Sequence, residues 1–180
     1  GYNIWHSTYQ GTQYMPSRSN IKVVLTIHDL NFIHEGKSQD KIKRALKKLQ
    51  KKIDRADHIV AISAFTLKDI QQHLQLNGKS TSVIYNGCNF MSIPELKEPE
   101  IKPKGNFIYT IGTITDKKNF HVLPALLVKN DYQLVISGIV QSQDYFNKIV
   151  AQAEAHGVMD RVLFTGSVSE NDKQWFMKNC

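Results

Sequence analysis

Short apolar runs rich in β-branched residues alternate with longer amphipathic patterns along this chain, and this alternation limits its possible folds more than any other feature. Residues 21–27 form the first run, and residues 39–55 follow with apolar side chains at helical spacing, namely Ile42, Leu46, Leu49 and Ile53. Strands separated by helices pair in parallel, because the helix returns the chain to the end of the sheet where the strand began. The pattern therefore predicts an α/β protein with doubly wound parallel sheets.

The same alternation continues through the rest of the chain. Further strands are predicted at residues 58–62, 82–85, 106–111, 132–137 and 161–165. A helix capped by Ser63 is expected to run through Phe65, Leu67, Ile70 and Leu74 and to be ended by residues 77–79, where Gly78 can adopt the left-handed conformation. Later helices are predicted at residues 120–128, at 142–156 and after Ser169.

A change of composition separates two runs of this alternation. Residues 92–105 contain Pro94, Pro99 and Pro103 among charged residues and show neither helical nor strand periodicity. We interpret them as a linker between a partial N-terminal domain at residues 1–91 and a partial C-terminal domain at residues 106–180.

The formal net charge of +7 is compatible with a nucleic acid, an anionic membrane surface or a phosphorylated small ligand as partner. Zinc-finger spacing, aromatic RNA-binding motifs and helix-turn-helix patterns are absent from the sequence, so we do not expect nucleic-acid binding. The two cysteines, Cys88 and Cys180, indicate no disulfide framework and favour a cytoplasmic setting. No apolar run reaches the roughly 18 residues of a membrane span.

Ligands of parallel sheets bind at the carboxyl ends of the strands, so the loops that follow the strands are the candidate sites. His28 and Asp29 follow the first strand. One interpretation is that they contact a polar substrate in a cleft. The other is that Asp29 caps a turn and His28 is an ordinary loop residue.

Residues 112–119 combine a glycine directly after a strand with two lysines before a helix. Gly112 permits close approach of a ligand to the backbone, and Lys117 and Lys118 add positive charge near the N–H groups of the helix start. Together these features are typical of a diphosphate site. A solvated lysine pair on a turn is the competing interpretation.

Two later strand ends carry small residues. Gly138 is suited to close packing against a ligand, and Gly166 with the backbone around Val168 could frame a flat nucleobase. Ordinary strand-to-helix turns explain both equally well.

The predicted helix at residues 39–55 is strongly basic. Solvated surface is the usual meaning of such a charge run. The alternative is peripheral contact with anionic lipid at the inner face of a membrane, or with the phosphate of a lipid-linked acceptor. The basic residues are Lys41, Lys43, Arg44, Lys47, Lys48, Lys51, Lys52 and Arg55.

Five short segments, taken in order, resemble the retaining glycosyltransferases of family 4, and among them the mannosyltransferase-like subset of bacterial polysaccharide synthesis. They are VLTIHDL at 24–30, RADHIVAIS at 55–63, VIYNG at 83–87, YTIGT through KKN at 109–119 and RVLFTGSVS at 161–169. Each segment is short, but the ordered set covers most of the chain.

The resemblance implies a GT-B fold, in which two Rossmann-like domains face each other, and transfer of a mannose-like hexose from a GDP- or UDP-sugar. The acceptor would be a glycan or lipid-linked glycan of polysaccharide or lipopolysaccharide synthesis. The resemblance also implies that no metal or other cofactor is needed, since lysines and backbone N–H groups stabilise the leaving diphosphate.

The resemblance also assigns roles to individual residues. Lys118 matches the family's phosphate lysine and His28 the histidine beside the donor sugar, so these two are the predicted catalytic residues. Lys117 stands where arginine is frequent. The predicted donor-binding residues, with the last two at the base, are Gly112, Thr113, Lys117, Lys118, Gly138, Gly166 and Val168.

Some family features differ or are missing. Thr113 stands where many members have arginine, so Lys117 and Lys118 would have to neutralise the diphosphate. Tyr85 replaces the usual proline. The glycine-rich first loop and the Glu-x7-Glu motif are absent, so we expect an incomplete piece that is inactive alone. The alternatives are another GT-B nucleotide-sugar enzyme, such as an epimerase or phosphorylase, and a non-catalytic module that binds nucleotide or a membrane surface.

Overall fold

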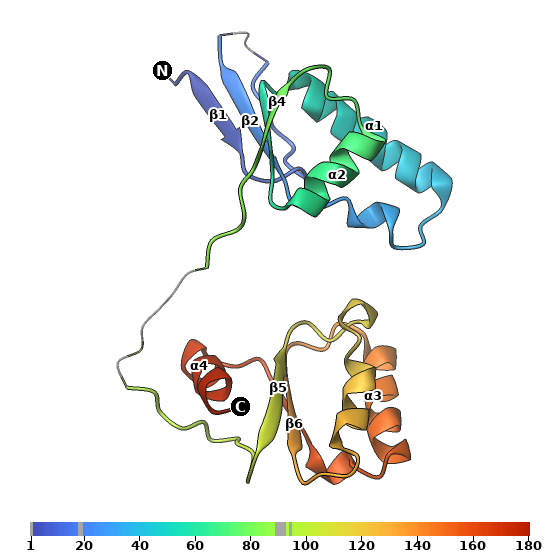
Figure 1. Cartoon of the computed structure of the whole chain (residues 1–180), viewed down its shortest axis with the longest axis vertical. Helices are drawn as coiled ribbons and strands as arrows, with labels where there is room; N and C mark the ends of the chain where they lie inside the picture. The colour runs from blue at the N-terminus through green and yellow to red at the C-terminus, as the bar shows by residue number, and fades with distance from the viewer. Residues whose placement is uncertain (1, 18–19, 89–92, 94) are drawn as a thin grey trace. The chain divides into compact units, whose positions relative to one another are not determined.

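The computed structural model describes residues 2–17, 20–88, 93 and 95–180, and the chain forms two compact units, Gly1–Asn89 and Phe90–Cys180. Each unit contains one parallel sheet (Figure 1). The predicted α/β class and the parallel pairing of the strands are confirmed. Of the linker predicted at residues 92–105, residues 92 and 94 lie outside the described residues.

The sheet of the first unit has four strands in the order β1-β2-β3-β4. Two of them, β2 and β3, lie where the sequence predicts them, because their alternate side chains are the buried core residues Val23, Leu25 and Ile59. All three neighbouring pairs are parallel. The strands are β1 (Ile4–Ser7), β2 (Lys22–Ile27), β3 (His58–Ala61) and β4 (Ser80–Val83).

Both outer strands differ from the prediction. Strand β1 is not predicted by the sequence pattern, because this edge strand exposes Ile4, includes polar residues and so lacks an apolar run. The strand predicted at 82–85 is β4, which begins and ends two residues earlier. The apolar pair Ile84 and Tyr85, which favoured the later position, lies beyond the strand and is exposed.

The two α-helices of the first unit are α1 (Gln39–Arg55) and α2 (Ala64–His73), with a short 3₁₀ helix, η1 (Asn31–Ile33), before them. The bounds of α1 match the prediction, and Ile42, Leu49 and Ile53 are buried as expected. The hydroxyl of Ser63 caps α2 by accepting the Thr66 N–H at 3.0 Å. The predicted helix end at residues 77–79 is wrong, because α2 ends at His73.

Phe65 is exposed because the buried stripe of α2 runs one residue later, through Thr66, Asp69 and Ile70. Helical spacing puts residues three or four apart on one face, so Ile70 and Leu74 share the stripe with Thr66 rather than with Phe65.

Both α1 and α2 pack on the same face of the first sheet, so the predicted doubly wound arrangement is wrong for the described part of this unit. Leu49 and Ile53 of α1 and Ile70 of α2 form one core with Leu25 and Ile59. Each right-handed crossover advances one strand in the same direction, which keeps successive helices on one side (Figure 1).

The second unit has three parallel strands, β5 (Phe107–Ile111), β6 (Gln133–Ser137) and β7 (Val162–Gly166), in the order β5-β6-β7. Helix α3 (Gln143–Ala155) packs on one face through Ile149, and α4 (Glu170–Asn179) covers the other through Phe176. Figure 1 shows these two helices on opposite sides of the sheet. This unit therefore has helices on both faces, as predicted.

Short helices fill the connections of the second unit. They are η2 (Asp116–Lys118), η3 (Phe120–Leu127) and η4 (Met159–Arg161). The prediction of an ordinary helix at 120–128 is corrected, because η3 is a 3₁₀ helix with Pro124 inside it. Proline has no N–H to donate and disfavours an α-helical conformation at the preceding residue.

Within the described part of the chain, no helix is both long and apolar enough to cross a membrane.

Candidate functional site

Three glycines follow or end the three strands of the second unit and bring its strand ends close together. The Gly112 N–H donates to the Ser137 carbonyl at 2.9 Å, and the Gly138 N–H donates to the Gly166 carbonyl at 2.8 Å. A β-carbon on Gly138 would lie only 1.8 Å from the Gly112 carbonyl oxygen, and the φ of Gly138 is +148°. Gly138 is therefore required for the packing of neighbouring strand ends, independently of any ligand.

The aliphatic part of Lys118 lies over Gly112. A β-carbon on Gly112 would be 3.4 Å from Cε of Lys118 and 3.7 Å from Cδ. Lys118 is the last residue of η2, and Asn119 follows it with a φ of +56°. The structure thus brings together two of the predicted donor-binding residues, at the carboxyl end of β5.

Lys117 and Thr113 border the same strand end, and their side chains are exposed, as is that of Lys118. The turn η2 has three residues, and η3 begins only at Phe120. Because the dipole of such short elements is small, attraction of an anion to this loop depends mainly on the lysine ammonium groups and nearby backbone N–H groups.

A surface pocket of about 370 Å³ lies beside the end of β7 and the start of α4. Val168, predicted to lie near a nucleobase, is part of its wall, whereas Gly166 is not among the lining residues. Residues 97–101 form the opposite wall. The remaining lining residues are Thr165, Ser167, Asn171, Asp172 and Phe176.

Asn171 holds this wall in place. Its Oδ1 accepts the Lys97 N–H at 3.0 Å, and its Nδ2 donates to the Lys97 carbonyl at 2.8 Å. Neither residue was predicted from the sequence, because Lys97 lies in a segment without periodicity and Asn171 resembles any polar residue of a first helical turn. No local signal could have paired them.

His28 lies at the carboxyl end of β2, in the first unit. Its Nε2 is 2.9 Å from the Thr8 carbonyl, and its own carbonyl accepts the Thr66 hydroxyl at 3.1 Å. A carbonyl oxygen only accepts hydrogen bonds, so Nε2 carries a proton and Nδ1 is the acceptor of the neutral ring. Asp29 Oδ1 accepts the Asn31 N–H at 3.0 Å, so the turn-capping interpretation is confirmed for Asp29.

A groove of about 650 Å³ runs between α1 and the loop that follows β1. Lys52 Nζ donates to the Gln10 carbonyl at 2.6 Å. Burial and the neighbouring charge of Lys48 lower the pKa of Lys52. The basic lining residues, four of the charged residues of α1, are Lys48, Lys51, Lys52 and Arg55.

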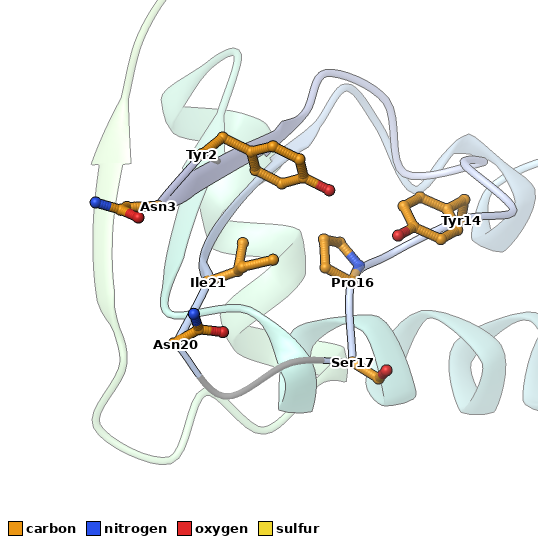
Figure 2. Close-up of a pocket in the computed structure, with 7 residues that line it drawn as sticks. All are labelled: Tyr2, Asn3, Tyr14, Pro16, Ser17, Asn20 and Ile21. Atoms are coloured by element: carbon orange, nitrogen blue, oxygen red, sulfur yellow. The ribbon is translucent and has the colours of Figure 1, made fainter.

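A further pocket of about 340 Å³ lies at the opposite end of the first sheet, where β1 and β2 begin. Figure 2 shows the side chains of Tyr2 and Tyr14 extending toward each other across it. Because ligands of parallel sheets bind at the carboxyl ends of strands, we assign no donor-binding role to this pocket. In the described ranges, no group of three or more His, Cys, Asp and Glu residues could hold a metal ion.

Two family models match the chain. The model described as "Glycosyltransferase Family 4" matches residues 2–90, and the model described as "Glycosyl transferases group 1" matches residues 92–180. The boundary between the two matches falls beside the boundary between the compact units.

One curated relative is the N-acetylgalactosamine-N,N'-diacetylbacillosaminyl-diphospho-undecaprenol 4-alpha-N-acetylgalactosaminyltransferase of Campylobacter jejuni. It is 26% identical over 128 residues, which are 70% of this chain and 34% of the relative. The chain therefore spans about a third of the length of this relative.

Solved structures resemble the chain in fold. HepE of Anabaena, solved in complex with UDP-glucose, gives a TM-score of 0.67 at 21% identity, covering 89% of this chain and 45% of that one. A glycosyltransferase of Rickettsia africae gives 0.56 at 13% identity, covering 87% and 43%. These likenesses support the predicted GT-B class of fold. Because the two family models together match the chain over nearly its whole length, it belongs to the group 1 glycosyltransferases.

Proposed function

We propose that the complete protein transfers a hexose, such as mannose or a related sugar, from a nucleoside-diphosphate donor to a glycan or lipid-linked acceptor, with retention at the anomeric carbon. The chain would supply the diphosphate-binding loop and the acceptor-side histidine. Polysaccharide or lipopolysaccharide synthesis would be the setting, at the cytoplasmic face of a membrane.

The observation that carries this proposal is the position of Lys118 over Gly112. Departure of the nucleoside diphosphate leaves negative charge on the phosphate oxygens, and an ammonium group held near them stabilises that charge in the transition state. Gly112 has no side chain, so Lys118 can lie against its backbone. Lys117 would share the charge, because Thr113 cannot. No bound metal or other cofactor is required in this scheme.

The remaining predicted residues have supporting roles. Val168, in the pocket beside β7, would contact the nucleobase together with Gly166. His28 would contact the donor sugar through Nδ1, since Nε2 donates to Thr8. Gly138 would act indirectly, by letting the ends of β5 and β6 approach each other.

The names of the relatives support the substrate class. The Campylobacter relative carries a diphospho-undecaprenol-linked acceptor in its name, and HepE was solved with UDP-glucose. These favour a UDP-sugar and a lipid-linked acceptor. The resemblance in sequence to mannosyltransferases favours a GDP-sugar equally, so both donors belong in the assay.

Substitution of Lys118 tests the proposal directly. In the full-length protein, Lys118→Ala should lower kcat by about 100-fold or more, because a preorganised group that stabilises transition-state charge is lost. Turnover is measured with GDP- and UDP-hexoses, and the product's anomeric configuration by NMR. The matched control is Lys148→Ala, an exposed lysine on α3.

Three results would count against this function. Wild-type turnover in Lys118→Ala would remove the role given to Lys118. A product with inverted configuration would contradict the retaining mechanism. Release of an epimerised sugar from the donor without an acceptor would favour the alternative GT-B enzyme.

We also propose that α1 contacts anionic lipid headgroups. Lys48 and Lys51 line the groove beside Lys52, whose lowered pKa reflects partial burial and repulsion between ammonium groups. A bound phosphate group would relieve this repulsion. Each basic residue near an anionic membrane surface contributes about 1 kcal/mol at moderate ionic strength.

Co-sedimentation with vesicles tests this contact. The full-length protein should bind phosphatidylglycerol vesicles and not phosphatidylcholine vesicles, and Lys48→Glu/Lys51→Glu should release it. Lys148→Glu/Lys178→Glu, which changes the net charge equally in the second unit, is the control. Equal loss of vesicle binding in both double variants would contradict a specific contact through α1, because net charge alone would then explain the binding.

A further inference from the structure

The loop of residues 8–12, which follows β1, is built around the backbone of His28. The side-chain amide of Gln10 contacts both ends of one short stretch of backbone. Its Oε1 accepts the His28 N–H at 2.9 Å, and its Nε2 donates to the Asp29 carbonyl at 3.1 Å. Gln10 was not singled out by any sequence motif.

The side-chain amide of Gln10 binds the backbone that follows β2, where pairing with β1 has already ended. The register of β1 with β2 stops at Ser7 opposite Leu25, while β2 continues to Ile27. His28 and Asp29 therefore lie beyond the backbone ladder on the β1 side. A carboxamide offers an acceptor and a donor side by side, as a peptide group does, so Gln10 can replace the missing strand.

The loop itself is held at a third point. The Gln10 carbonyl accepts Lys52 Nζ, so α1 supports the backbone from which the amide extends. On the other side, the Thr8 carbonyl binds Nε2 of His28, and the Tyr9 ring meets the imidazole edge-to-face at a centroid distance of 5.9 Å. One loop thus fixes both the main chain and the ring tautomer of His28.

We propose that Gln10 is a positioning residue that fixes the direction in which His28 presents Nδ1. The inference rests on the proposed role of His28 beside the donor sugar. Gln10 does not contact the substrate in this account. It acts through the His28–Asp29 backbone, and the Thr8 carbonyl completes the arrangement by selecting the tautomer.

The test is a double-mutant cycle in the full-length enzyme. Gln10→Ala should lower kcat about tenfold with little change in the donor KM, the effect expected from losing one or two neutral hydrogen bonds that orient a catalytic group. In the His28→Ala background the same substitution should have almost no effect, because Gln10 acts through His28. Gln72→Ala, an exposed glutamine on α2, is the control.

Gln10→Glu tests whether the amide group itself is needed, because glutamate has nearly the same size as glutamine. The carboxylate can accept the His28 N–H, but its second oxygen would face the Asp29 carbonyl oxygen without a proton between them. We expect it to be no faster than Gln10→Ala. Wild-type kcat in Gln10→Glu, or additive effects of Gln10→Ala and His28→Ala, would overturn the inference.

Nitrogen NMR of the His28 ring gives an outcome that does not depend on turnover. In the wild type the ring should show the Nε2–H tautomer, and Gln10→Ala should move it toward a mixture, because the ring loses its alignment with Thr8. An unchanged tautomer in Gln10→Ala would overturn the positioning role. Wild-type turnover in His28→Ala would instead refute the role proposed for His28 in that function, whatever the NMR result.

Discussion

Asp57 joins the start of β2 to the end of α1. Its Oδ2 accepts the Val23 N–H at 2.8 Å, its Oδ1 accepts Lys22 Nζ at 3.0 Å, and its own N–H donates to the Val23 carbonyl at 2.8 Å. The hydrogen bond from Val23, followed by the contact with Lys22, lowers the pKa of the Asp57 carboxyl below its ordinary value.

The direction of this shift predicts how stability depends on pH. A carboxyl with a lowered folded-state pKa stabilises the fold above its unfolded-state pKa, and the contribution is lost as pH falls through the folded-state pKa. As the pH falls below about 4, the Tm of Asp57→Asn should therefore decrease less than the Tm of the wild type.

Thermal unfolding followed by circular dichroism between neutral and acidic pH measures this difference. Asp160→Asn, which changes an exposed carboxyl in η4, should keep the wild-type profile. Parallel curves for Asp57→Asn and the wild type would contradict the assignment. The contribution is expected to be modest, since the side chain is partly exposed and solvent screens it.

At the scale of elements, α4 does more than cover the second sheet. Phe176 fills the core against Phe107, while Asn171 in the first turn holds the backbone of Lys97 from both sides. The helix start is fixed by Ser169, whose hydroxyl accepts the Asp172 N–H at 3.1 Å. One wall of the pocket that includes Val168 thus depends on a single amide.

Removal of that amide should loosen residues 97–101. We expect Asn171→Ala to increase the rate of tryptic cleavage after Lys97 several-fold, because both hydrogen bonds to the Lys97 backbone are lost. Mass spectrometry of the fragments locates the cleavage. Asn147→Ala, on the exposed side of α3, should leave that rate unchanged, and equal rates in all three proteins would rule out the proposed restraint.

For the whole molecule, the accuracy of the sequence-based prediction follows from the range of the interactions involved. The core strands and α1 were predictable, because a periodic apolar pattern records burial locally. The hydrogen bonds from side-chain amides to distant backbone groups were not predictable. Gln10 and His28 are 18 positions apart, and Asn171 and Lys97 are 74 apart. Such pairs form only once the fold has brought them together.

The position of Lys118 was predictable only in part. Glycine after a strand and lysine after a turn indicated an anion site, but the contact between Gly112 and Lys118 is set by the turn η2, which the sequence pattern did not predict. Similarly, β1 was missed because this edge strand has no local apolar pattern.

Gly138 and Gly112 constrain each other by direct packing, without a ligand between them. The carbonyl oxygen of Gly112 occupies the space that a side chain at position 138 would need. A larger residue there could be accommodated only if the end of β5 retreated, and the surface on which Lys118 rests would retreat with it. Positions 112 and 138 therefore share one excluded volume, and we expect a larger residue at position 138 to displace Lys118 together with the end of β5.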